Sequence, residues 1–349
     1  MLYKLKDIFD LQMGKTPSRN NIEYWNTNDY KWVSIADLTK TDKYIYDTKE
    51  YLSKKAVNES GIKIIPANTV IMSFKLSIGK TAITAEDMYS NEAIMAFHDK
   101  HIVEILPEYI FYLFKYKNWD DGSNKAVMGK TLNKAILSEV EIDICSIEEQ
   151  RKIVNVLDKI MNLISARKKE LSYLDTFTKA RFVELFGDPI INSKGLETKE
   201  LNEVLVLKAG DFTAASDISV EPTEINIYPC YGGNGIRGYV AEYNQEGEYS
   251  LVGRQGALSG NVQYATGKFK NTEHALLVKP IIRMNSIWLN QLLLNLDLKR
   301  YQTGAAQPGL SVKNLQDIQI IMVPIDEQRV FADFVHQIDK SKLQKVSAA

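Results

Sequence analysis

Three Gly-Lys-Thr strings are the first residues of this chain whose types suggest chemistry, because such strings occur in phosphate-binding loops. They begin at Gly14, Gly79 and Gly129. A phosphate-binding loop needs a further glycine five residues earlier, so that backbone N–H groups can surround the phosphate. Those positions hold Phe9, Phe74 and Asn124. The strings therefore argue against nucleotide hydrolysis.

A second candidate for chemistry is the set Asp188, Glu197 and Lys199, which loosely imitates the carboxylates and lysine of a metal-dependent nuclease. Such a set arises by chance from surface charge in most chains of this size. The histidines offer no better site, since a zinc ion needs further ligands at suitable spacing and none accompanies His98, His101, His274 or His336. We expect no catalytic residue and no metal site.

Composition indicates a water-soluble protein with two domains. The chain has 349 residues, of which 45% are hydrophobic and 25% are charged, and its net charge is -1. No apolar run approaches the ~18 residues of a membrane span, and the first residues lack the apolar region of a signal peptide, so we expect a cytoplasmic location without membrane contact. The two cysteines, Cys145 and Cys230, fit buried apolar positions better than a disulfide framework.

The strongest feature of the sequence is an internal repeat. Residues 147–151 (Ile-Glu-Glu-Gln-Arg) return 178 residues later as residues 325–329 (Ile-Asp-Glu-Gln-Arg). The same offset aligns two apolar patterns, Leu132, Leu137, Val140 and Ile142 with Leu310, Leu315, Ile318 and Ile320. Upstream, Glu92 aligns with Glu273 at an offset of 181, and Gly14 aligns with Gly210 at 196. Because the order is kept while the offset changes, we interpret the chain as two copies of one domain with different loop insertions.

A long helix is predicted after the first copy, from residue 148 to 186. The pattern repeats every seven positions and is mostly apolar. One seam is Leu157, Ile164, Leu171, Thr178 and Leu185, and the other is Ile153, Ile160, Arg167, Leu174 and Arg181. Apolar residues at helical spacing usually belong to an ordinary core, but a helix of roughly 58 Å is too long for that interpretation. Gly187 and Pro189 should end it. We expect a coiled-coil-like spacer.

The repeated Glu-Gln-Arg junction resembles the specificity subunits of type I restriction-modification enzymes. In the first copy, residues 14–18 (Gly-Lys-Thr-Pro-Ser), Tyr24-Trp25 and residues 32–38 (Trp-Val-Ser-Ile-Ala-Asp-Leu) look like the opening of that family's target-recognition domain. In the second copy, residues 231–239 and 251–256 look like another variant of it. The resemblance covers nearly the whole chain.

The resemblance implies an α+β fold with a pseudo-two-fold internal repeat and two target-recognition domains separated by long helices. The first domain would span residues 1–146, a spacer helix 147–188, the second domain 189–325, and a second, shortened spacer helix 326–349. Each domain would read one half of a split double-stranded DNA target. The helices would dock modification subunits, which carry S-adenosylmethionine, and a restriction subunit would complete the complex. The chain itself would bind no cofactor.

DNA-reading residues are expected on glycine-containing loops, because Asn, Gln, Arg and Lys recognise base edges in the major groove. The candidates in the first domain are Lys15, Arg19, Lys75 and Lys80. Those in the second domain are Asn234, Arg237, Arg254, Gln255 and Asn261. For each of them, capping a turn or contacting a phosphate is an alternative role.

The second spacer helix has only 24 residues left, or roughly 36 Å. Its apolar stripe is Val330, Phe331, Phe334 and Ile338. If it runs antiparallel to the first helix, it leaves Ile153, Leu157 and Ile160 bare, and we expect these three residues to bind a partner subunit.

Two other functions stay open at this point. One is a stand-alone DNA-binding regulator, which a neighbouring methyltransferase gene would argue against. The other is an enzyme that acts through Asp188 and Glu197, which an assay of the isolated chain with magnesium and DNA would test.

Overall fold

The computed structural model describes residues 1–349 except 26, 76, 120–131, 305–307 and 348–349, and it does not describe the side chains of 344–347. The Gly-Lys-Thr string at Gly129 therefore lies outside the described residues. The chain divides into two compact units, Met1–Ser165 and Ala166–Ala349. Among the described residues, no helix is both long and apolar enough to cross a membrane.

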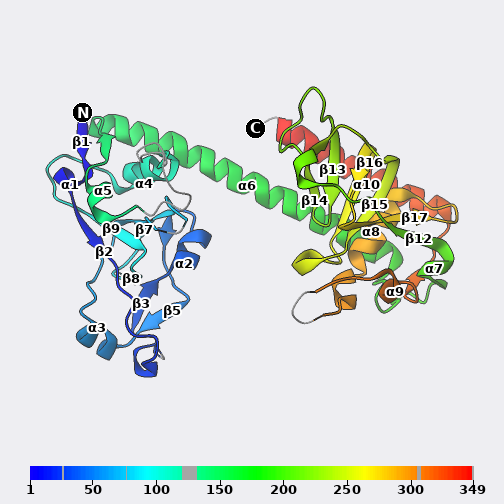
Figure 1. Cartoon of the computed structure of the whole chain (residues 1–349), viewed down its shortest axis with the longest axis horizontal. Coiled ribbons are helices and arrows are strands. Elements are labelled where there is room, and N and C mark those ends of the chain that lie inside the picture. The colour runs from blue at the N-terminus through cyan, green and yellow to red at the C-terminus, as the bar shows by residue number, and fades with distance from the viewer. Residues whose placement is uncertain (26, 76, 120–131, 305–307, 348–349) are drawn as a thin grey trace. The chain divides into compact units, whose positions relative to one another are not determined.

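The first unit is built on a five-stranded sheet with the order β2-β9-β6-β7-β4 (Figure 1). Its strands are β2 (Phe9–Met13), β4 (Tyr44–Ile45), β6 (Val70–Ser73), β7 (Thr81–Thr84) and β9 (Ile94–Asp99). A three-stranded sheet contains β3 (Tyr30–Val33), β5 (Glu50–Leu52) and β8 (Tyr89–Ser90), and β1 (Leu2–Lys4) pairs with β10 (Glu141–Asp143). The helices before the spacer are α1 (Leu5–Ile8), α2 (Ile35–Lys40), α3 (Lys54–Ser60), α4 (Pro107–Tyr116) and α5 (Lys134–Ser138), with the short 3₁₀ turn η1 (Ile22–Tyr24).

The core of the first unit forms where α4 covers the five-stranded sheet. All four residues of β6 are buried, as expected for a strand covered on both faces. From α4, Phe114 packs edge-on against Phe97 of β9, with ring centroids 4.8 Å apart.

The second unit repeats this plan on a six-stranded sheet with the order β12-β17-β15-β16-β13-β14. Its strands are β12 (Leu205–Ala209), β13 (Tyr228–Gly232), β14 (Gly235–Val240), β15 (Gln245–Gly253), β16 (Val262–Asn271) and β17 (Ala275–Pro280). A separate pair joins β11 (Thr198–Glu200) to β18 (Gln319–Ile321). The helices are α7 (Leu201–Val204), α8 (Ser286–Asn295), α9 (Val312–Leu315) and α10 (Ile325–Ser347), with the 3₁₀ turns η2 (Ala215–Asp217), η3 (Gly256–Leu258) and η4 (Leu298–Tyr301).

Strand register confirms the internal repeat. In the first unit Leu11 of β2 pairs with Phe97 of β9, and in the second Leu207 of β12 pairs with Val278 of β17. These partners differ by the 196 and 181 residues that the sequence alignment requires. The small sheets agree as well, because Tyr3 pairs with Ile142 and Lys199 pairs with Ile320. The two units are therefore copies of one α+β domain.

The repeated Glu-Gln-Arg motif owes its glutamine to a buried hydrogen-bond network. Gln150 is 0% exposed; its Nε2 donates to the carbonyl oxygens of Glu104 and Cys145, and its Oε1 accepts from the N–H of Leu106. Gln328, 2% exposed, donates in the same way to Val323 and accepts from the N–H of Asn285. Each glutamine thus fastens the start of a long helix to the domain that precedes it.

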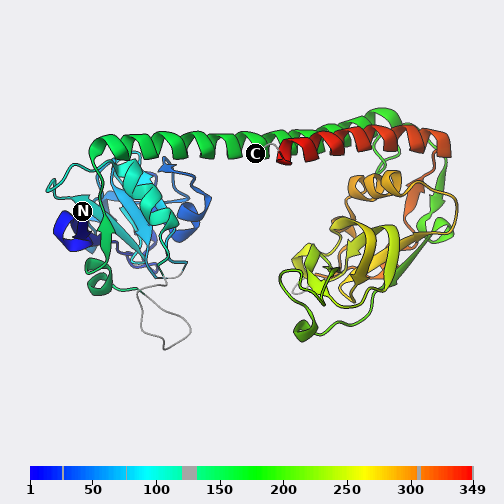
Figure 2. The ribbon, with the colours of Figure 1, turned by 90° about the horizontal axis from the view of Figure 1, so that it is seen from above.

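The predicted spacer helix is confirmed as α6 (Ile147–Phe186), which ends at Gly187 with φ +79°. Within the second unit, α10 lies beside the C-terminal half of α6 (Figure 2). Phe331 stacks edge-on against Phe182 at 5.4 Å, and Phe177 against Phe334 at 5.4 Å. Further along, Lys342 forms an ion pair with Asp175. The partner residues run in opposite directions, so this pair of helices is antiparallel.

Two residues of the expected helix stripes face elsewhere. Val330 is 68% exposed, and the buried face of α10 uses Val335 instead. Leu157 was expected to be bare, but it packs against the core of the first unit, next to buried Val154. A helix carries apolar residues at i, i+3 and i+4 on more than one face when two neighbours cover it, and spacing alone does not separate those faces.

Candidate nucleic-acid interface

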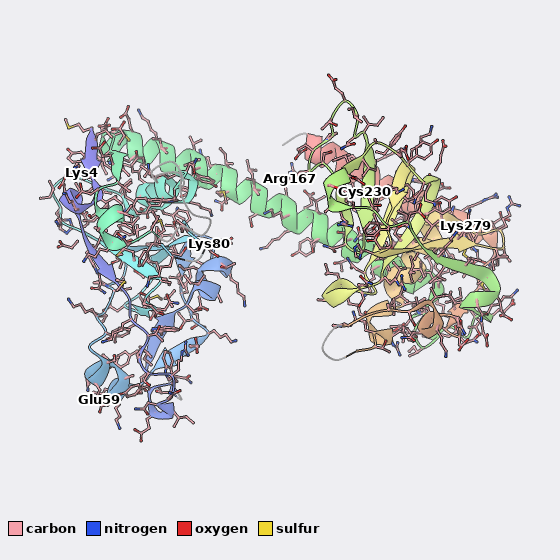
Figure 3. All side chains as sticks on the ribbon, in the orientation of Figure 1. Lys4, Glu59, Lys80, Arg167, Cys230 and Lys279 are labelled. Atoms are coloured by element: carbon pink, nitrogen blue, oxygen red, sulfur yellow. The ribbon has the colours of Figure 1, made fainter. Side chains whose placement is uncertain are left out.

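The hairpin loop between β6 and β7, residues 74–80, carries two of the predicted DNA-reading residues. The N–H of Ser73 donates to the carbonyl of Lys80 at 2.9 Å, and the N–H of Gly79 donates to the carbonyl of Ser73 at 3.0 Å. Gly79 has φ +87°, which favours glycine at this turn. Lys75 is the second residue of the loop. Exposed Lys80, labelled in Figure 3, is its last residue. The loop therefore presents two amines at one end of the sheet.

The loop between β15 and β16, residues 254–261, has the same backbone pattern. The N–H of Gly253 donates to the carbonyl of Asn261, and the N–H of Gly260 donates to that of Gly253, both at 2.8 Å. Gly260 has φ +81°. These bonds place Gln255 at the position of Lys75, and Asn261 at the position of Lys80. Four candidates chosen from separate parts of the sequence thus occupy two equivalent positions.

Each loop is also hydrogen-bonded to the residue just before a neighbouring strand, β9 in the first unit and β17 in the second. In the first unit the N–H of Phe74 donates to the carbonyl of Ala93 at 3.0 Å, and in the second the N–H of Arg254 donates to that of His274 at 3.0 Å. Arg254, itself a candidate, therefore uses its backbone to hold the loop against the segment before β17.

The remaining candidates of the second domain gather around the same loop. Asn234 lies in the turn between β13 and β14, and its Oδ1 accepts a hydrogen bond of 2.8 Å from Nδ2 of Asn261. The side chain of Arg237 passes over the backbone of Gly232. If residue 232 had a Cβ, that atom would lie only 2.5 Å from Cδ of Arg237. Gly232 therefore leaves room for that arginine. The structure brings the five residues to one end of the sheet.

In the first domain, Arg19 and Lys15 follow β2 and make internal contacts. The guanidinium of Arg19 lies 3.8 Å from the ring centroid of Trp25 and forms an ion pair with Glu50. Lys15 donates through Nζ to the carbonyl of Ser60. Their roles toward DNA stay predictions.

Glu92 links three parts of this surface. It accepts a hydrogen bond from Thr16, and this bond, with smaller contributions from the charges of Lys75 and Arg19, holds the pKa of Glu92 below its usual value. The loop after β2 and the loop 74–80 therefore share one electrostatic environment.

Sequence reasoning missed the basic pair Lys299 and Arg300 of η4, both exposed. A Cβ on Gly260 would lie 2.7 Å from the backbone nitrogen of Lys299, so η4 packs directly on the loop 254–261. In the first unit Trp119 takes this place, because a Cβ on Gly79 would lie 3.0 Å from its ring. The one sequence signal for Trp119 and η4 is indirect: Gly79 and Gly260, on which they pack, align at an offset of 181.

A second candidate surface is the apolar face of the first half of α6. Ile153 is 40% and Ile160 45% exposed, as predicted for a partner site. Val156 and Leu163, which the sequence reasoning did not select, are exposed on the same stretch. Leu157 does not belong to this face.

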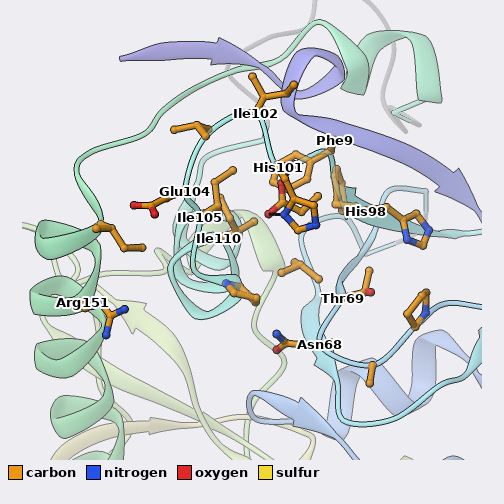
Figure 4. Close-up of a pocket in the computed structure, with 18 residues that line it drawn as sticks. Phe9, Asn68, Thr69, His98, His101, Ile102, Glu104, Ile105, Ile110 and Arg151 are labelled. Atoms are coloured by element: carbon orange, nitrogen blue, oxygen red, sulfur yellow. Dashed lines mark hydrogen bonds and ion pairs between the residues drawn. The ribbon is translucent and has the colours of Figure 1, made fainter.

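A cleft of about 720 Å³ lies beside the start of α6 in the first unit (Figure 4). It is bordered by residues 66–70 and 97–105, at the ends of β6 and β9 opposite to the loop 74–80, and by Arg151 of α6. Burial lowers the pKa of His98, whose Nε2 has no hydrogen-bond partner among the described residues. The equivalent cleft of the second unit measures about 180 Å³. The two units thus differ in the size of this cleft.

Asp188, one of the possible nuclease residues, has a local structural role. Asp188 accepts a hydrogen bond from the N–H of Ile190 and so caps the turn after α6. Across the residues that the structure describes, no three His, Cys, Asp or Glu side chains are grouped so as to hold a metal ion.

Two copies of one domain, each with a polar loop at the same end of its sheet, and a long helix that continues from the first copy define a class of protein with an internally repeated α+β domain. A family model described as "Type I restriction modification DNA specificity domain" matches residues 1–173 and 193–347. The chain belongs to this family of type I restriction-modification specificity subunits, whose function is the recognition of DNA targets within a larger complex.

Individual relatives agree with the assignment. The chain is 31% identical to the specificity subunit of the type I restriction enzyme EcoprrI from Escherichia coli, over 96% of this chain and 86% of that protein. It is 31% identical to the MjaIX specificity subunit from Methanocaldococcus jannaschii, over 64% of this chain and 55% of that protein. The S subunit from M. genitalium has a similar fold, with a TM-score of 0.56, 16% identity and coverage of 100% of this chain and 91% of that one.

Proposed function

We propose that the chain is a non-catalytic specificity subunit that binds a bipartite double-stranded DNA target, with one half read by each domain. The observation that carries this proposal is the equivalence of the loops 74–80 and 254–261. At its second and last positions each loop has a side chain that can recognise a base edge, Lys75 and Lys80 in one copy and Gln255 and Asn261 in the other. Because the side chains differ while the backbone is shared, the two halves of the target should differ in sequence.

The second part of the proposal concerns assembly. The first half of α6 exposes Ile153, Val156 and Ile160, and an exposed apolar face of this kind favours a protein partner. We assign this face to a modification subunit, which would carry S-adenosylmethionine and the methyl-transfer chemistry. A restriction subunit would join the same complex.

The test is to purify the chain with a modification subunit and to map the methylated adenines. A double Lys75→Ala, Lys80→Ala variant should relax one half of the target and leave the other half unchanged. A double Gln255→Ala, Asn261→Ala variant should do the reverse, because each base contact contributes about 1–3 kcal/mol of discrimination. Lys179→Ala, at an exposed lysine of α6, is the matched control and should leave both halves unchanged.

Two outcomes would overturn the proposal. Methyl transfer by the isolated chain would show that it is catalytic. Relaxation of the same half by both double variants would show that the loops do not read separate parts of the target.

A further inference from the structure

Gln255 is held by a relay of side chains that no other predicted DNA-reading residue has among those the structure describes. Its Oε1 lies 3.0 Å from Nδ1 of His274, and Nε2 of His274 lies 3.1 Å from Oε1 of Glu273. The backbone of His274 also holds the loop, through the N–H of Arg254. Gln255 itself is exposed at the start of the loop.

The carboxylate of Glu273 orients the ring of His274. A carboxylate can only accept hydrogen bonds, so the contact with Glu273 requires a proton on Nε2 of His274. The other oxygen, Oε2, is buried and has no hydrogen-bond partner among the described residues, so His274 is the donor available to this group. A ring that carries a proton on Nδ1 as well donates to Oε1 of Gln255, whereas a ring protonated on Nε2 alone accepts from the NH₂ group of that amide. In either state the contact favours one orientation of the amide.

Amide orientation matters for reading a base. The two ends of a glutamine side chain have similar shapes but opposite hydrogen-bonding character, and a bidentate contact with adenine N6 and N7 requires the correct end at each atom. An amide that rotates freely would meet the base in either orientation and would discriminate less. Fixing Gln255 before DNA arrives therefore favours one base over the others.

The first domain provides the comparison. At the positions of Gln255, His274 and Glu273 it has Lys75, Ala93 and Glu92. A lysine ammonium has three donors and no acceptor, so it has no orientation that needs to be fixed. The histidine is thus present in the copy that has an amide at the second position of its loop, and absent in the copy that has an amine there.

We propose that His274, oriented by Glu273, is a positioning residue that fixes the amide of Gln255 and thereby determines which base the second domain accepts at one position of the target. This inference rests on the proposed function, since it requires that the loop 254–261 reads DNA. His274 acts through Gln255 and contacts no base itself.

The experiment is selection of a randomised double-stranded DNA library by the purified chain. For the parent we expect a bipartite consensus. His274→Ala should reduce the preference at one base pair of the second half about 5-fold, the effect of losing one hydrogen bond, and leave the first half unchanged. His274→Asn keeps a side-chain N–H near the position of Nδ1 and should restore most of the preference. His336→Ala, at an exposed histidine of α10, is the matched control.

Circular dichroism of each variant separates a folding defect from a change in specificity. A parent that selects no sequence would overturn the proposed function, and with it this inference. A parent that selects a bipartite consensus, combined with a folded His274→Ala variant that selects the same consensus at every position, would overturn the inference alone. Uniform weakening at all positions, without rescue by His274→Asn, would also overturn it, because a purely structural role produces that result.

Discussion

One face of the long helices is covered in the second copy and bare in the first. Phe331 of α10 is 0% exposed and packs against Phe182 and Phe186 of α6. At the equivalent position of the first copy, 178 residues earlier, Ile153 is 40% exposed. The second domain is preceded by the tail of α6, which packs on α10. Among the residues described for the first unit, no helix takes that place. The repeat therefore creates two faces of the same kind, and folding covers one of them.

The largest expected effect is a difference in the free energy of unfolding between a substitution on the covered face of α10 and one on the bare face of α6. Phe331→Ala removes a fully buried ring and should lower the free energy of unfolding by about 3–5 kcal/mol. Ile153→Ala removes a side chain that is 40% exposed and should cost less than about 1 kcal/mol. Urea denaturation followed by circular dichroism measures both. Equal losses would mean that the face of Ile153 is covered within the folded chain.

The same comparison can be made for assembly. Ile153→Asp and Ile160→Asp should weaken binding of a modification subunit by at least ~2 kcal/mol while leaving the free energy of unfolding nearly unchanged, because an unpaired charge would be buried only in the complex. Val330→Asp, on an exposed apolar position of α10 outside the buried face, is the control. Unaltered co-elution of the two α6 variants in gel filtration would contradict the assignment of this face.

A third comparison concerns the two glutamines that fasten the helices. Gln150→Ala and Gln328→Ala each leave buried backbone groups without partners, so each should lower the free energy of unfolding by about 1–3 kcal/mol. We expect a somewhat larger loss for Gln150, which makes three hydrogen bonds to the backbone, than for Gln328, which makes two equivalent ones. If Gln150→Ala lowered the free energy of unfolding and Gln328→Ala left it unchanged, the network would be needed in the first copy only.

The smallest effect belongs to the ion pairs that hold α6. In the first unit Asp158 lies 2.6 Å from Lys43, and in the second Asp175 lies 2.8 Å from Lys342. Partial burial raises the pKa of Asp158, but hydrogen bonds from Lys43 and Tyr112 outweigh this effect, so the pKa lies below its usual value. Asp158→Asn should cost about 0.5–1 kcal/mol near neutral pH, and Asp175→Asn, with a more exposed carboxylate, about half of that or less.

The pH dependence of the Asp158 pair follows from the direction of this shift. The folded chain binds a proton at Asp158 less readily than the unfolded chain does, so the pair contributes stability above the usual carboxyl pKa. That contribution should decline as the pH falls below the usual value of 3.8 and through the lower folded value. Chemical denaturation of the parent and of Asp158→Asn across this range should give curves that converge at low pH. A constant difference would contradict the assignment.

The repeat, the spacer helix and the positions of the two glycine-containing loops could be predicted from the sequence because each leaves a linear signal. The Glu-Gln-Arg motif marks both helix starts, since its glutamine is buried in the same network in both copies. Glycines mark the loops, since Gly79 and Gly260 have positive φ. These signals survive because backbone geometry restricts the residue type at each position.

Side-chain partners could not be predicted in the same way. Spacing showed that Leu157 is apolar and regularly placed, but did not show that it faces the first domain rather than a partner. The pairing of Arg19 with Trp25 and Glu50, and the relay from Glu273 to Gln255, join segments from different strands or loops. Such contacts depend on the three-dimensional arrangement of the elements, which local sequence patterns do not encode.

The claim that each copy reads its own half of the target is tested most directly by exchanging residues 1–146 for the same region of a relative with a different target, and then mapping the methylated adenines of the assembled complex. The two copies have separate cores and separate loops, so the exchange should change one half of the recognised sequence and leave the other half intact. A change in both halves, or in neither, would contradict the two-reader account.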